Sequence, residues 1–147
     1  MGSSATEISL SLQELIDRAL HGGIVQVEAV GSPLHPLLFD DTGRMFILYS
    51  GEEQVEPMVL AIQAIREHCP DVQRCALAID TRLTMRDGKK WDAITVLACS
   101  RDEAEGTMWA QCYVPKRLLR KFRTEGEPEE IGTIRNYIAL ALQDAAA

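Results

Sequence analysis

Residues 73–114 read QRCALAIDTRLTMRDGKKWDAITVLACSRDEAEGTMWAQCYV, and this stretch decides the fold. Apolar and polar side chains alternate on either side of Asp87-Gly88, a dipeptide that is typical of β-hairpin turns. A second polar turn, at residues 101–106, separates the return strand from a third strand that ends at Val114. Short turns between successive strands predict an antiparallel three-strand meander.

Signals on both sides of this stretch predict three helices and three further strands. A capping box at residues 11–14 begins a helix that Gly22-Gly23 is expected to end. Pro57 suits the start of a second helix, and the acidic residues after Pro128 suit the first turn of a third. Strands are expected at residues 24–30, 35–39 and 44–49. The predicted fold is an α+β domain of order α-βββ-α-βββ-α, whose antiparallel sheet contains a C-terminal three-strand meander and is packed by three helices.

The length and composition of the chain indicate one soluble domain. With 147 residues, 46% hydrophobic and 25% charged, the chain fits a single globular domain over residues 1–147, with residues 1–7 expected to be flexible. No run approaches the roughly 20 apolar residues of a membrane helix, and the first residues lack the pattern of a signal peptide. We therefore expect a cytoplasmic protein without a membrane partner. The four cysteines lack metal-binding spacing and are expected to pack in the core, so no cofactor is expected.

The charge of the chain is negative overall but locally reversed. The net charge is −7, with −8 in residues 1–115, +5 in residues 116–123 and −4 from residue 124 onward. An acidic chain is a poor general binder of nucleic acid, because phosphate affinity comes from accumulated Lys and Arg. The basic run at 116–123, either a short helix or an edge strand, could contact RNA, an anionic lipid surface or an acidic partner. The favoured interpretation is that it pairs with the acidic start of the predicted last helix.

The predicted meander has two unlike faces. A two-residue turn at Asp87-Gly88 would place Arg82 opposite Ala93 and Asp80 opposite Thr95. One face is then an apolar core, and the other collects Trp91, Trp109, Tyr113, Arg82, Asp80, Gln111 and Thr95. A face rich in aromatic residues and arginine is typical of an interaction surface. It could also line a small-molecule pocket, or lie beneath a terminal helix.

Three functional hypotheses follow from these patterns. The leading one is a non-catalytic interaction module, homo-oligomeric or bound to a protein partner, that uses the aromatic face or Arg117, Arg120 and Lys121 of the basic run. The second is a small-molecule-binding or hydrolytic domain in which Asp80, His35 and Arg82 converge in one cleft, with Asp40 or Asp41 as further ligands of a metal. Asp40 and Asp41 are more simply explained as turn residues. The third is an RNA-contacting accessory protein that uses residues 116–123.

Overall fold

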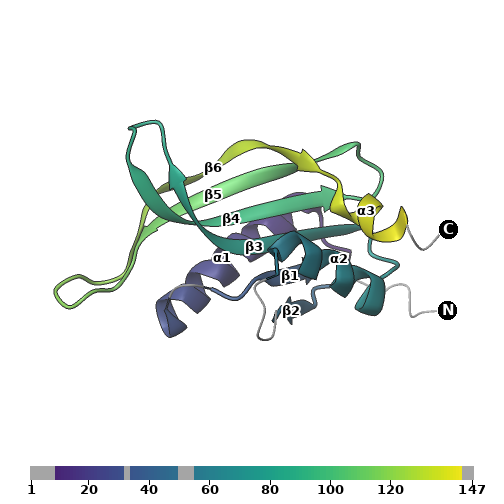
Figure 1. Ribbon diagram of the computed structural model, residues 1–147, viewed down its shortest axis with the longest axis horizontal. Coiled ribbons are helices and arrows are strands. Elements are labelled where there is room, and N and C mark those ends of the chain that lie inside the picture. Colours follow the sequence, from purple (N-terminus) through teal and green to yellow (C-terminus); the bar gives the residue numbers. More distant parts are fainter. Residues whose placement is uncertain (1–8, 32–33, 50–54, 144–147) are drawn as a thin grey trace.

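The computed structural model describes residues 9–31, 34–49 and 55–143. Six strands form one antiparallel sheet in the order β2-β1-β3-β4-β5-β6, and three helices pack against it (Figure 1). The sequence prediction of an α+β fold with three helices and six antiparallel strands is confirmed. In chain order the elements are α1 (Leu12–Val30), β1 (Leu37–Asp40), β2 (Met45–Ile47), α2 (Pro57–His68), β3 (Arg74–Thr84), β4 (Lys90–Ser100), β5 (Glu105–Val114), β6 (Arg123–Arg135) and α3 (Tyr137–Gln143).

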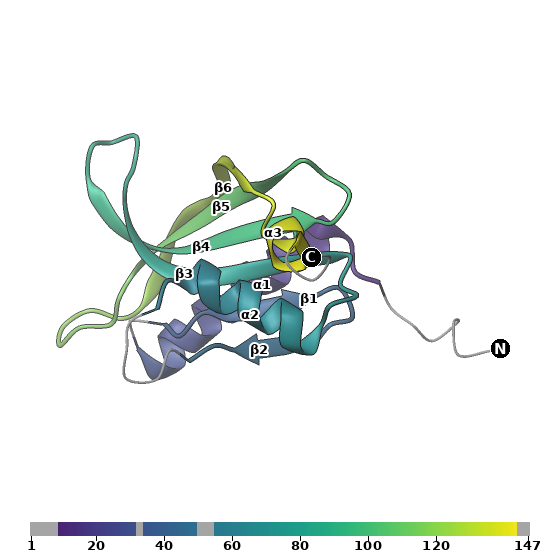
Figure 2. The ribbon, with the colours of Figure 1, turned by 45° about the vertical axis from the view of Figure 1, so that its right-hand side comes forward.

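The sheet separates two hydrophobic cores. On one face, α1 packs on alternate residues of the central strands, such as Ala76 and Ala78 of β3 and Val96 of β4. On the other face, α2 and α3 pack on the residues in between, such as Leu77 and Leu97. Figure 2 shows α1 and α2 on opposite sides of the sheet. Because successive side chains of a strand point to opposite faces, strands that are buried on both faces are apolar throughout.

Helix α1 is longer than the sequence predicts. The capping box is present: Ser11 Oγ accepts a hydrogen bond from the Glu14 amide, and Glu14 Oε1 accepts one from the Ser11 amide. The helix then runs through Gly22-Gly23 to Val30, so the prediction of a strand at residues 24–30 is wrong. The glycines serve close packing instead of helix termination, because a Cβ atom on Gly23 would lie 2.6 Å from Ile94 Cγ2.

The C-terminal part of the chain also differs from the prediction. Residues 123–135 form β6, which pairs along β5 and extends the meander to four strands, so no helix begins at Pro128. Pairing with a neighbouring strand satisfies the backbone of this segment and outweighs its acidic helix-start signal. Helix α3 begins only after Asn136, whose Oδ1 accepts hydrogen bonds from the Ile138 and Ala139 amides.

The β3–β4 hairpin has a register one residue away from the predicted one. The Met85 amide donates to the Lys89 carbonyl, so the loop has three residues, and Gly88 at its end has a φ of 79°. Arg82 consequently pairs with Asp92, and Leu83 pairs with Trp91. A shift of one residue moves every side chain of a strand to the other face. The predicted aromatic face is therefore divided, with Trp91 on the side opposite to Asp80 and Arg82.

Candidate interaction site

The connection between β5 and β6 forms a hairpin arm that projects from one end of the sheet (Figure 1). We call residues 114–123 the arm. At its tip, Arg117 and Arg120 exchange two backbone hydrogen bonds of 3.0 and 3.1 Å. Leu118 and Leu119 are the two central residues of this turn, and they are 99% and 95% exposed.

Turn formation does not explain two leucines at this position. Tight turns are normally built from Gly, Asn, Asp, Pro or Ser, which supply special backbone angles or local hydrogen bonds. Neither Leu118 nor Leu119 has a positive φ, so the turn accepts most residue types. Large apolar side chains on an exposed turn contribute nothing to the stability of this chain, whereas burial against a partner would yield about 1.5–3 kcal/mol for each leucine. The pair therefore marks a surface that another molecule can cover.

Cationic side chains surround the leucine pair. They belong to Lys116, Arg117, Arg120, Lys121 and Arg123. Arg123 lies 3.4 Å from Glu125, and the other four have no ion-pair partner in the described part of the chain. The predicted pairing of this run with an acidic helix start is wrong, because residues 128–130 belong to β6. The tip thus presents an apolar centre inside a positively charged rim.

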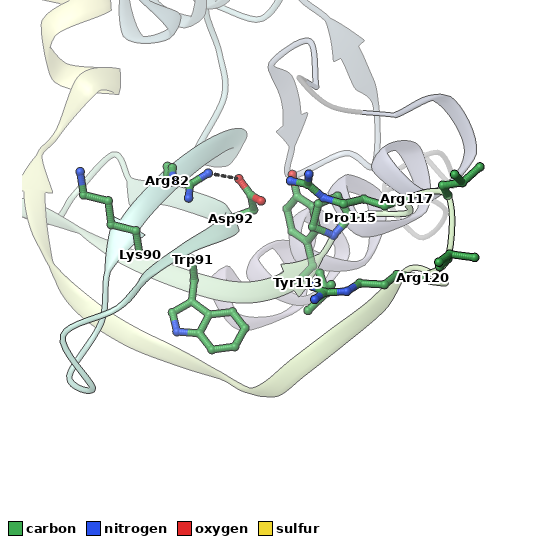
Figure 3. A pocket seen from close by; sticks show the side chains of 11 residues that line it. Arg82, Lys90, Trp91, Asp92, Tyr113, Pro115, Arg117 and Arg120 are labelled. Atoms are coloured by element: carbon green, nitrogen blue, oxygen red, sulfur yellow. Dashed lines mark ion pairs between the residues drawn. The ribbon is translucent and has the colours of Figure 1, made fainter.

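A groove of about 450 Å³ lies at the base of the arm (Figure 3). Its lining joins the arm to the ends of β3, β4 and β5, and it brings together five residues that the sequence singled out: Arg82, Trp91, Tyr113, Arg117 and Arg120. The Arg82 guanidinium lies 3.9 Å from the Asp92 carboxylate. The lining contains four cationic residues and one acidic residue, so the groove is mainly basic.

Tyr113 and Asp80 are structural anchors of the arm. Tyr113 is 1% exposed, its hydroxyl donates a 2.7 Å hydrogen bond to Asp80 Oδ1, and its ring stacks on Phe122 at 5.5 Å. Asp80 Oδ2 accepts a 3.0 Å hydrogen bond from the Leu34 amide. The stack on Phe122 ties the second strand of the arm to the core beneath α1.

Gln111 and Trp109 also face inward. Trp109 packs against the core that includes α1. The Gln111 side-chain amide lies 3.3 Å from the Glu125 carbonyl and 3.0 Å from the Gly126 carbonyl. These contacts fall where the β5–β6 register shifts, so Gln111 fixes the irregular backbone from which the arm departs. The sequence named both residues as candidates for an interaction surface; in the structure Trp109 packs on the core and the Gln111 side chain contacts the backbone of β6.

Two residues of the hydrolytic hypothesis, His35 and Arg82, line different hollows. His35 packs on Tyr49, with ring centroids 4.7 Å apart, and lines a hollow beside Ile47. Arg82 lines the groove at the base of the arm instead. Among the residues that the structure describes, no group of three or more His, Cys, Asp or Glu could hold a metal ion. The Asp40 side chain accepts hydrogen bonds from the Thr42 and Arg44 amides, which is the turn role expected of it.

Sequence reasoning identified the cations of the arm but missed its two leucines. The sequence signal that could have identified them is a pair of adjacent apolar residues inside a basic turn that contains no glycine or asparagine. Comparison of the chain with protein-family models, curated proteins and solved structures found no match. None of the described helices is long and apolar enough to cross a membrane. The function of this chain is therefore inferred from its own residues.

Proposed function

We propose that this chain is a non-catalytic interaction module that binds a protein partner, including another copy of itself, through the arm. The observation that carries this proposal is the nearly complete exposure of Leu118 and Leu119 at the tip. An apolar centre surrounded by arginine and a polar rim is the composition of a protein-binding hot spot. The turn fixes the backbone of both leucines, so binding costs less backbone entropy than it would in an unstructured loop.

The arm is less suited to RNA. Binding of single-stranded nucleic acid combines cations with aromatic side chains on which bases stack. The aromatic residue within the arm is Phe122, and its ring stacks on Tyr113. The fully exposed side chains of the tip are aliphatic, which suits an apolar pocket of a protein better than a base.

Replacing both leucines tests this function. We expect Leu118→Ser/Leu119→Ser to weaken association by at least about tenfold, because burial of two leucines is worth more than the 1.4 kcal/mol that a tenfold change requires. The matched control is Val30→Ser/Val59→Ser, which removes two exposed apolar side chains from α1 and α2. Self-association is measured by sedimentation velocity, and binding of other proteins by capture on the immobilised chain followed by mass spectrometry.

The comparison between the variants decides the result. A complex that forms with the wild type and the valine control, but not with the leucine variant, supports the proposal. Equal complexes with all three proteins would show that the arm is not the interaction surface. Urea denaturation of each variant checks that the fold is retained, and we expect the midpoint of the leucine variant to agree with that of the wild type because both leucines are almost fully exposed.

A further inference from the structure

A second surface of this chain is chemically complementary to the arm. A groove of about 330 Å³ lies between the tip of the β3–β4 hairpin and β6. Its lining includes three apolar residues, Leu83, Met85 and Ile131, and two acidic residues, Glu129 and Glu130. We call this the acceptor groove.

An irregularity in β6 shapes the acceptor groove. Met108 of β5 pairs with Gly132 and Trp109 pairs with Glu130, so Ile131 is an extra residue without a partner in the register. A β-bulge of this kind redirects the side chains around it. Ile131 is left 36% exposed, next to two carboxylates for which the described residues provide no ion-pair partner. The groove therefore offers both apolar surface and unpaired negative charge.

The groove and the arm tip match in both properties. Leu118 and Leu119 correspond to the apolar floor, and Arg117 and Arg120 correspond to Glu129 and Glu130. We propose, building on the function above, that the arm tip of one copy of this chain docks in the acceptor groove of a second copy. The arm and the β3–β4 hairpin of a single chain project from the same end of the sheet and diverge in both ribbon views (Figures 1 and 2), so we assign the occupant to another molecule.

The charge distribution of the chain favours this arrangement. Outside residues 116–123 the chain carries a net charge of −12, so a contact between two copies that excludes the basic arm brings two negatively charged surfaces together. Arg86 also lines the groove, so the three charged residues of the lining carry a net charge of −1, and Glu127 lies on the same strand. Charges farther apart than a Debye length of about 8 Å are largely screened at physiological salt, so the contact itself dominates.

Each copy offers one arm and one groove. Reciprocal docking of both arms closes a two-fold dimer, the commonest symmetry of soluble homo-oligomers. We therefore expect a dimer that forms through two equivalent arm–groove contacts and weakens as the salt concentration rises. Folding of the single chain does not explain why the two leucines of the tip are exposed. In this dimer both leucines would be buried.

A charge exchange between the two surfaces tests the proposal. Arg117→Glu/Arg120→Glu makes the arm acidic, and Glu129→Arg/Glu130→Arg makes the groove basic. We expect each variant alone to dissociate at least about tenfold more readily than the wild type, and an equimolar mixture of the two to recover a dimer, because opposite charges then meet at both contacts. Sedimentation velocity measures the dimer, and the control Glu28→Arg/Glu67→Arg places the same charge change on α1 and α2.

The outcomes separate this inference from the proposed function. Recovery of the dimer in the mixture, with the control unaffected, supports docking in the acceptor groove. If Leu118→Ser/Leu119→Ser abolishes the dimer but the groove variant leaves it intact, the arm does not dock in the acceptor groove. The proposed function of the arm is then retained. If the wild type stays monomeric at all concentrations, a second copy of the chain is not the partner of the arm. If that monomer instead binds vesicles of phosphatidylserine and phosphatidylcholine through the leucines, the partner is a lipid surface and both proposals fall.

Discussion

Gly23 determines how closely α1 can approach β4. A Cβ atom at this position would lie 2.6 Å from Ile94 Cγ2, and Ile94 is fully buried. The methyl group it would meet is held by the surrounding core and cannot move without displacing its neighbours. The glycine is thus required by the contact between helix and sheet, although a glycine inside a helix is unfavourable by itself.

We expect Gly23→Ala to lower the free energy of unfolding by about 1–2 kcal/mol. Overpacking of a core costs about 1–3 kcal/mol, and the better helix propensity of alanine recovers up to about 1 kcal/mol of this. Urea denaturation measures the change. Gly132→Ala is the matched control, because its added Cβ has no atom within 4 Å, and it should alter stability by less than about 0.5 kcal/mol. A Gly23→Ala protein as stable as the wild type would contradict the proposed role of this contact.

The same residue types that attract attention in the sequence have different roles in the structure. Asp80, Tyr113, Trp109 and Gln111 were predicted to share a sheet face that is an interaction surface, lines a pocket or lies beneath a helix, and in the structure they pack or form hydrogen bonds within the chain. Residue identity indicates that a side chain can donate or accept a hydrogen bond. It does not indicate which face of the strand is buried, because that depends on the length of a neighbouring turn.

At the scale of elements, the orientation of the arm depends on the irregular start of β6. The Gln111 side chain contacts the carbonyls of Glu125 and Gly126, and Gly126 has a positive φ of 72°. A regular ladder would pair these groups with the backbone of β5 instead. The side chain of one residue therefore replaces backbone pairing at the base of the arm.

We expect Gln111→Leu to loosen the arm without unfolding the chain. Loss of the contacts removes hydrogen bonds to part-buried carbonyl groups, which should lower the free energy of unfolding by about 0.5–1.5 kcal/mol. Hydrogen exchange should accelerate at the amides of residues 123–127, and association through the arm should weaken. Gln13→Leu serves as the control, because it removes an exposed hydrogen bond to Asp17 in α1 and should leave exchange in β6 unchanged. Unaltered exchange in the Gln111 variant would refute this role.

Two elements were assigned incorrectly from the sequence, and the cause is the same in both. Residues 24–30 alternate like a strand but continue α1, and residues 128–135 carry a helix-start signal but form β6. Local patterns favour a conformation by less than about 1 kcal/mol per residue, so contacts with the rest of the sheet decide the outcome.

At the scale of the whole molecule, the core packed by α2 and α3 contains ionisable groups that are kept neutral. Burial raises the pKa of the Cys69 and Cys99 thiols from 9.0 to about 11 and also raises the pKa of Cys75. The Tyr137 hydroxyl donates a 2.6 Å hydrogen bond to the Leu97 carbonyl, and burial raises its pKa as well. All of these groups belong to the core packed by α2 and α3.

This arrangement predicts that the chain loses stability in alkaline solution. The folded thiols have raised pKa values, so their contribution to stability is complete below pH 9 and is lost between pH 9 and 11, where the unfolded chain ionises first. Each thiol adds a slope of up to about 1.4 kcal/mol per pH unit. Urea denaturation at pH 8 to 10.5 measures this slope, which Cys99→Ala should make shallower. Equal slopes in the two proteins would show that Cys99 does not contribute.

The sequence by itself determined the meander, the first helix cap and the reversed charge of residues 116–123. These features depend on neighbouring residues, through turn chemistry, capping and hydrophobic alternation. Only the tertiary structure decided the register of β3 against β4, the burial of Tyr113 and Asp80, and the exposure of Leu118 and Leu119. The physical reason is that a face is buried or exposed according to what packs on it, and those partners lie far away in the chain.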